Sequence, residues 1–191
     1  MSRIPSLSKS AHLGHVFRRF PRGASSLGQY SDELLRGESE LTIGEREMLA
    51  AYVSGLNACS FCHGNHKLVA EVHGVDPELL ESPLSSPGGS GIDEKWLPLL
   101  AYVRKLTESP SSITDRDAQS VFDAGFSEDA LFDAISVCAL FNFMNRIVEG
   151  CGVLFTDGDL DAARQRHALG ERSATPYQDF IRASTKADVK S

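Results

Sequence analysis

Apolar residues recur at helical spacing along most of the chain, and no run of four to eight residues alternates convincingly between apolar and polar side chains. This pattern limits the fold to helices that pack through apolar stripes. With 191 residues, of which 41% are hydrophobic and 24% charged, the chain is long enough to bury one sizeable core. The sequence therefore predicts an all-α, single-domain helical bundle.

Capping signals mark the expected helix ends. Thr42 and Glu45 form a capping box that opens a helix through Leu56. Asn57 is then expected to cap the next helix, which ends at Gly74. Further helical segments are expected within His12 to Arg36, from about Glu94 to Glu108, after Thr114, and from Ser127 to Glu149. The last of these is apolar on most of its circumference, which predicts a central, largely buried helix.

Charge and composition exclude several classes of partner. The formal net charge is −7 and the chain has no basic stripe, so nucleic acid is not an expected partner. The N-terminal residues contain no apolar run long enough for a signal peptide, and no later segment is expected to span a membrane. We therefore expect a cytoplasmic protein with no membrane partner. In that reducing compartment the four cysteines are not expected to form structural disulfides.

The segment NACSFCHGNH, residues 57–66, gathers two cysteines and two histidines. On a helix, Cys59, Cys62 and His66 form one stripe, because residues three and four apart share a face, whereas His63 points elsewhere. Four readings compete for this segment: a haem clamp of the C-x-x-C-H type formed by Cys59, Cys62 and His63, a zinc site, a redox-active thiol pair, and two buried structural cysteines.

The rest of the chain favours the redox pair. Covalent haem attachment generally belongs to exported proteins, and zinc needs four tetrahedral ligands, of which one straight helix supplies two or three at most. A thioredoxin-like site needs a βαβ unit, which the helical pattern does not offer. Two thiols one helical turn apart need only a modest adjustment to reach disulfide geometry, and a helix N-terminus with nearby imidazoles favours thiolate. We therefore expect neither a bound cofactor nor a resident metal.

A longer pattern connects this stripe to the preceding helix. The spacing Glu47, eleven residues, Cys59, two residues, Cys62, three residues, His66 resembles the active-site pattern of the alkyl hydroperoxidase D-like proteins in the carboxymuconolactone decarboxylase family. The flanking sequences LTIGEREMLAAYVSGLNACSFCHGNH and LFNFMNRIVEGCGV resemble the peroxidase-related enzymes of that family. The resemblance implies a helical core at residues 34–153, with an N-terminal helical extension at 1–33 and a C-terminal tail at 154–191.

The resemblance also implies a function, that of an antioxidant, alkylhydroperoxidase-like thiol peroxidase acting on hydroperoxides. Cys62 would be the peroxidatic thiol, Cys59 the resolving thiol and proton donor, and Glu47 with His66 a proton relay. An external dithiol, such as a lipoyl group or a thioredoxin-like protein, would restore the thiol pair. A homo-oligomer is expected because assembly is usual in the family.

Two features bear on these roles. Phe61 stands where the best-known members have a histidine, which implies a shorter relay or a weaker activity. If Asn57 is the cap, Cys59 lies nearer the positive end of the helix dipole than Cys62, which would make Cys59 the more acidic thiol. The resemblance assigns the peroxidatic role to Cys62, and we follow it.

An alternative from another class stays open, in which Cys59, Cys62 and His66 hold a metal at a subunit contact of a non-enzymatic binding module. Outside the stripe, Cys138 is expected to be a small core residue. Asn142 could tie helices together or approach the cysteine cluster.

Overall fold

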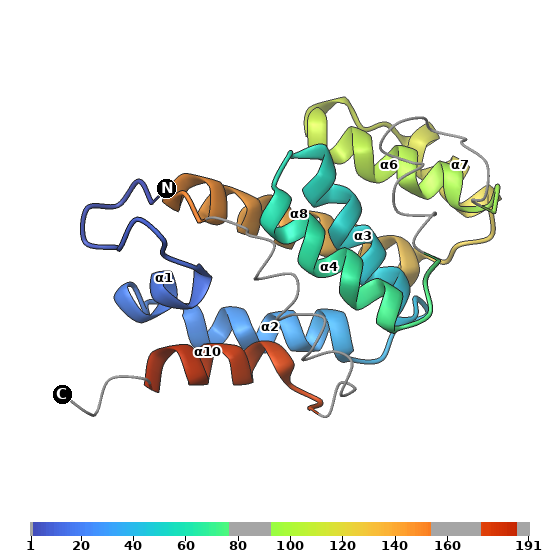
Figure 1. The fold of residues 1–191 in the computed structure, drawn as a ribbon. Helices are drawn as coiled ribbons and strands as arrows, with labels where there is room; N and C mark the ends of the chain where they lie inside the picture. The colour runs from blue at the N-terminus through green and yellow to red at the C-terminus, as the bar shows by residue number, and fades with distance from the viewer. Residues whose placement is uncertain (1, 77–92, 154–172, 187–191) are drawn as a thin grey trace. The chain divides into compact units, whose positions relative to one another are not determined.

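Residues 2–76, 93–153 and 173–186 are described by the structure, a computed structural model (Figure 1). Throughout these residues the regular structure is helical and no strand occurs, which confirms the predicted all-α fold class. The α-helices are α1 (Leu13–Arg19), α2 (Ala24–Arg36), α3 (Ile43–Leu56), α4 (Ser60–Val72), α6 (Trp96–Glu108), α7 (Asp115–Asp123), α8 (Glu128–Cys151) and α10 (Pro176–Lys186), and a 3-10 turn spans Pro110–Ser112.

The chain divides into two compact units. One unit comprises residues 1–38 and 146–191, and the other comprises residues 39–145. The second unit therefore contains α3, α4, α6, α7 and most of α8, and it holds the whole cysteine–histidine stripe. The boundaries expected after residues 33 and 153 stay a prediction, and residues 154–172 of the expected tail lie outside the described part.

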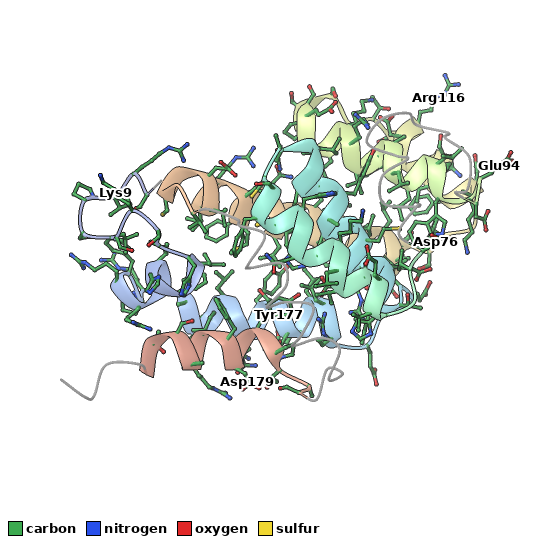
Figure 2. All side chains as sticks on the ribbon, viewed as in Figure 1. Lys9, Asp76, Glu94, Arg116, Tyr177 and Asp179 are labelled. Carbon is green, nitrogen blue, oxygen red and sulfur yellow. The ribbon has the colours of Figure 1, made fainter. Side chains whose placement is uncertain are left out.

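The second unit is built on an antiparallel hairpin of α3 and α4, with α6 packed against α3 and α7 against α6 (Figure 1). Many of its apolar side chains are enclosed, and the charged side chains of Glu94 and Arg116 point outward (Figure 2), whereas those of Arg46 and Glu47 are buried. The fully buried aliphatic side chains of this core are Leu49, Val53, Leu99, Val103, Val121 and Val137. Burial of such side chains is the main stabilising contribution to this unit.

Most of the predicted caps are confirmed. The Thr42 hydroxyl accepts a hydrogen bond from the Glu45 amide at 3.2 Å, and the Glu45 carboxylate accepts one from the Thr42 amide at 2.7 Å. Ser127 caps α8 by accepting from the amide of Ala130 at 3.0 Å. At α7, the Asp117 carboxylate accepts hydrogen bonds from both the amide and the hydroxyl of Thr114. Each interaction satisfies a polar group at a helix end that has no partner within the helix.

Helix α8 is only partly the buried central helix that its sequence predicts. Cys138 on its inner face is 1% exposed, as expected of a core residue, whereas Phe132 and Phe143 are 67% and 51% exposed. By length and composition alone α8 is able to cross a membrane, contrary to the expectation that no segment would be. Half of its most apolar window is buried inside the protein, and a single helix of this kind is weak evidence for a membrane span.

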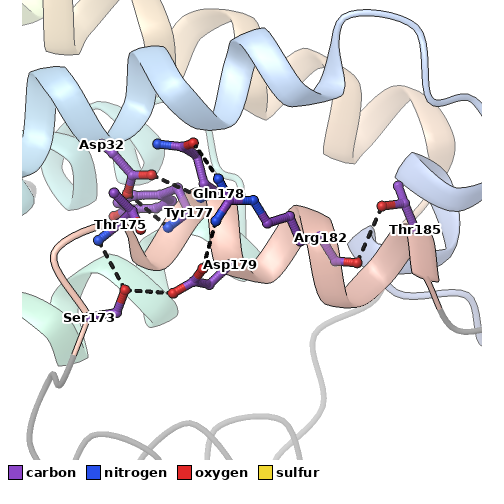
Figure 3. A network of polar contacts seen from close by, with 8 residues as sticks. All are labelled: Asp32, Ser173, Thr175, Tyr177, Gln178, Asp179, Arg182 and Thr185. Atoms are coloured by element: carbon purple, nitrogen blue, oxygen red, sulfur yellow. Dashed lines mark hydrogen bonds and ion pairs between the residues drawn. The ribbon is translucent and has the colours of Figure 1, made fainter.

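The first unit contains α10, a helix within the segment expected to be a tail. α10 packs along α2 and also contacts α1 (Figure 1). The Asp32 carboxylate on α2, which is 4% exposed, accepts hydrogen bonds from the amides of Tyr177 and Gln178, each at 2.9 Å (Figure 3). These amides belong to the first turn of α10, so Asp32 caps α10 from a different helix.

We predict that Asp32→Ala loosens α10. The two first-turn amides lose a charged acceptor, and a hydrogen bond to a charged group contributes about 1.5–3 kcal/mol. Amide hydrogen exchange at residues 177–181 should therefore accelerate by roughly tenfold or more. Glu33→Ala, which removes an exposed acid from the same helix, serves as the control and should leave this exchange unchanged. Equal protection of α10 in the wild type and in Asp32→Ala would contradict the capping role.

A second prediction concerns pH. The Lys105 ammonium, 2.6 Å away, and the hydrogen bonds from Thr114 lower the pKa of Asp117 from 3.8 to about 2. A carboxyl with a lowered pKa stabilises the fold above its unfolded-state pKa, and this contribution disappears as the pH falls from 3.8 through about 2. Asp117→Asn should therefore lower the urea midpoint at pH 7, and the difference from wild type should shrink below pH 4. Asp115→Asn, which removes an acid from the same helix turn but keeps the Lys105–Asp117 pair, is the control.

Candidate active site

The turn between α3 and α4 is a Schellman motif that ends on the first cysteine. The amide of Cys59 donates to the carbonyl of Ser54 at 2.9 Å, and the amide of Ala58 donates to that of Gly55 at 2.9 Å. Asn57 is the C-cap of α3, and the residue after it, Ala58, has a φ of 53°. Glycine is usual at that position, because a left-handed conformation costs other residues on the order of 1–2 kcal/mol.

This geometry corrects the expected helix start. Asn57 does not cap α4: the N-cap is Cys59, two residues later, with φ −86° and ψ 90°. The left-handed residue at position 58 reverses the chain, so α4 cannot start before it. Cys59 thus lies just outside α4 and Cys62 at its third residue. The helix dipole acts over the whole first turn of α4, so it does not distinguish the acidity of the Cys59 thiol from that of the Cys62 thiol.

Both cysteines of the stripe are enclosed. Cys59 is fully buried and Cys62 is 3% exposed. Neither is in a disulfide, and the same holds for Cys138 and Cys151. The two thiols lie near one another at the start of α4, three residues apart in sequence. Their burial suits both a protected redox pair and two structural core residues.

The structure brings Glu47 of α3 to His66 of α4. The Glu47 carboxylate is fully buried, and its Oε2 lies 2.5 Å from His66 Nδ1, whose side chain is 13% exposed. A carboxylate is an acceptor, so Nδ1 carries the proton, and in the neutral ring Nε2 is then the basic nitrogen. The ring of Phe141 on α8 contacts the imidazole edge-on, with 4.4 Å between ring centroids. The carboxylate and the aromatic ring together fix the orientation of the imidazole.

His63 and Phe61, which belong to the same segment 57–66, have different surroundings. His63 Nδ1 lies 2.9 Å from the carbonyl of Ala51, to which it donates, so this histidine ties α4 to α3. Phe61 is half-buried, and its carbonyl accepts a hydrogen bond from Asn65 at 2.8 Å. An aromatic hydrocarbon ring at position 61 supplies no acid or base, so the only imidazoles of the motif are those of His63 and His66.

An amide network behind the turn was not predicted from the sequence. Asn57 Nδ2 donates to Asn145 Oδ1 at 2.9 Å and to Asn142 Oδ1 at 3.2 Å, both on α8. Asn145, only 2% exposed, donates in turn to the hydroxyl of Ser54 at 3.0 Å. Of the two roles considered for Asn142, the structure supports the tying of helices. The available signal was two asparagines in the otherwise apolar run LFNFMN, because buried amides require hydrogen-bond partners.

Among the described residues, no group of three or more histidine, cysteine, aspartate or glutamate side chains is arranged to hold a metal ion. The metal-binding alternative for Cys59, Cys62 and His66 therefore has no geometric observation in its favour, and it stays a prediction to be tested by metal analysis.

Comparisons with known proteins agree on the fold. No protein-family model matches the chain, and no curated protein matches it. Among solved structures, an uncharacterized peroxidase-related protein from Silicibacter sp. TM1040 is 26% identical, covers 70% of each chain and has a TM-score of 0.62. The alkylhydroperoxidase AhpD core of an uncharacterized peroxidase-related protein from Ralstonia eutropha JMP134 is 21% identical, covers 78% of each chain and has a TM-score of 0.70.

These likenesses define the class of protein: over the residues that the structure describes, the chain is helical and has the fold of the AhpD core. Both neighbours are named peroxidase-related proteins, and the second is named an alkylhydroperoxidase AhpD core.

Proposed function

We propose that the chain is a thiol peroxidase that reduces hydroperoxides through Cys59 and Cys62, with Glu47 and His66 as a proton relay. One observation carries this proposal: a fully buried carboxylate lies 2.5 Å from an imidazole that shares a helix face with Cys62. A buried carboxylate needs a strong hydrogen-bond donor, and a carboxylate-bound histidine is a suitable general base. The structural neighbours support the coarser role of a peroxidase-related protein.

In the first step, the proton of the Cys62 thiol passes to His66 Nε2, while Glu47 stabilises the resulting imidazolium. The Cys62 thiolate attacks one oxygen of the hydroperoxide, and the O–O bond breaks. Cys62 becomes a sulfenic acid, oxidised by two electrons, and the leaving alkoxide takes the proton back from His66 to form an alcohol.

In the second step, the Cys59 thiolate displaces the hydroxyl group of the Cys62 sulfenic acid. An S–S bond forms and water leaves with the Cys59 proton. An external dithiol then restores both thiols by exchange and is itself oxidised to a disulfide. A lipoyl group or a thioredoxin-like protein is the class of reductant that we propose, together with a cytoplasmic location and a homo-oligomeric state.

The relay predicts unequal effects for the two histidines. His66→Ala should slow hydroperoxide reduction roughly a hundredfold, the usual contribution of a positioned acid–base group. His63→Ala, which removes an imidazole from the same helix, should retain most of the rate because His63 bonds a backbone carbonyl. Glu47→Gln should resemble His66→Ala. Initial rates with cumene hydroperoxide and a dihydrolipoyl donor would measure these effects, and equal rates for both histidine variants would exclude the relay.

The two cysteines should trap different species. Wild-type protein treated with one equivalent of hydroperoxide should lose two thiols together, whereas Cys59→Ser should accumulate a sulfenic acid on Cys62 and stop after one turnover. Cys62→Ser should react poorly, and Cys151→Ser, a control outside the stripe, should behave as wild type. Mass spectrometry after a sulfenic-acid trap locates the label. A label on Cys59 in Cys62→Ser, with none on Cys62 in Cys59→Ser, would reverse the assignment. Stoichiometric zinc in the purified protein would instead support the metal-binding alternative.

A further inference from the structure

We propose that Asn57 is a positioning residue for the thiol pair, an inference that rests on the proposed redox role of Cys59 and Cys62. Its side-chain amide holds the turn that places Cys59 at the N-cap of α4, and it thereby sets how readily the two thiols join in a disulfide. Asn57 touches neither the peroxide nor the reacting sulfur atoms in this scheme, so it acts through the backbone.

The turn needs such support because its left-handed residue is not glycine. Ala58, at φ 53°, is the one non-glycine residue with a positive φ among the described residues. The positive-φ residues that follow α4, α7 and α8 are glycines: Gly74, Gly125 and Gly152. The left-handed conformation is intrinsically unfavourable for alanine, so contacts with surrounding residues have to stabilise it.

The amide network supplies such contacts to two residues of the Schellman motif, Ser54 and Asn57. Asn57, at the C-cap, donates to Asn145 Oδ1 at 2.9 Å. Asn145 donates to the hydroxyl of Ser54 at 3.0 Å, and Ser54 is the residue whose carbonyl accepts from the Cys59 amide. The buried side-chain amide of Asn145 therefore connects Asn57, which precedes the left-handed Ala58, to Ser54, whose carbonyl accepts from the Cys59 amide. A satisfied buried network of this kind favours a single conformation.

The position of Cys59 matters because disulfide geometry is narrow. The two Cβ atoms must come within about 3.5–4.5 Å of each other. An N-cap side chain faces the backbone of the third helical residue, which here is Cys62. If Ala58 relaxes from its left-handed conformation, Cys59 leaves the N-cap position, and the effective concentration of one thiol at the other falls. The disulfide then becomes less stable, and the reduction potential of the pair becomes less negative.

The test is an equilibrium titration of the full chain in glutathione buffers, which requires no peroxide. Oxidation joins the two sulfur atoms and passes two electrons and two protons to glutathione disulfide, giving two glutathione thiols. Asn57→Ala should lower the equilibrium constant for this reaction about tenfold, a change of about 30 mV in a two-electron potential. Ala58→Gly in the Asn57→Ala background should recover most of that change, because glycine adopts a positive φ without strain.

Ser39→Ala is the matched control. The Ser39 hydroxyl donates to Asp133 on α8 at 2.5 Å, so its removal also deletes a side-chain hydrogen bond to α8, but at the other end of α3. Its reduction potential should equal that of wild type even if its unfolding midpoint falls. A purely structural role for Asn57 would lower the midpoint in the same way and leave the potential unchanged, and that result would overturn the proposal.

Ala58→Val keeps the test usable if Asn57→Ala does not fold. The side chain at position 58 is exposed, and a β-branched residue disfavours a positive φ, so the potential should shift in the same direction as in Asn57→Ala. An unchanged potential in a folded Ala58→Val variant would contradict the inference while leaving the peroxidase proposal intact. A wild-type chain that forms no Cys59–Cys62 disulfide in any buffer would overturn both.

Discussion

The hydrogen bond between Glu47 and His66 determines how α3 and α4 can pack. Glu47 is fully buried in a helix whose neighbouring residues, such as Leu49 and Ala50, are completely enclosed as well. An isolated charge in such surroundings would be strongly destabilising, and the imidazole on the facing helix removes that penalty. Because the pair joins the middle of α3 to the middle of α4, it fixes the register of the hairpin, and the cysteines at the start of α4 are positioned as a consequence.

Much of the fold could be predicted because its signals are local. The capping box at Thr42 and the serine before α8 act within three or four residues, so sequence spacing is sufficient to find them. The expected start of α4 was two residues too early, and the cause is again local. Asn57 is a good N-cap residue, and the alanine at position 58 carries no sign of the left-handed conformation that delays the helix. Helix α10 was missed because its cap, Asp32, lies far away in the sequence.

The candidate site also contains residues that local spacing predicts and residues that it does not predict. The shared face of Cys62 and His66 follows from helical geometry once the segment is known to be helical, whereas Cys59 precedes the helix as its N-cap. The amide network does not, because Asn57 and Asn145 are separated by most of the second unit and meet only when α8 packs against the turn. A buried asparagine signals that a partner exists, but a single sequence does not identify that partner. The residues expected to react were therefore easier to find than the residues that hold them.

The shared residue between α3 and α4 makes this hairpin intolerant of changes in length. Cys59 completes the Schellman motif of α3 and is also the N-cap of α4, so the connection contains no spare residue. Each residue added to an α-helix turns the following side chains by about 100°. A single insertion between Cys59 and Cys62 would therefore rotate His66 relative to the turn and away from Glu47, and a single deletion there would do the same in the opposite sense. Changes of side chain along this connection therefore preserve the hairpin geometry more readily than changes of length.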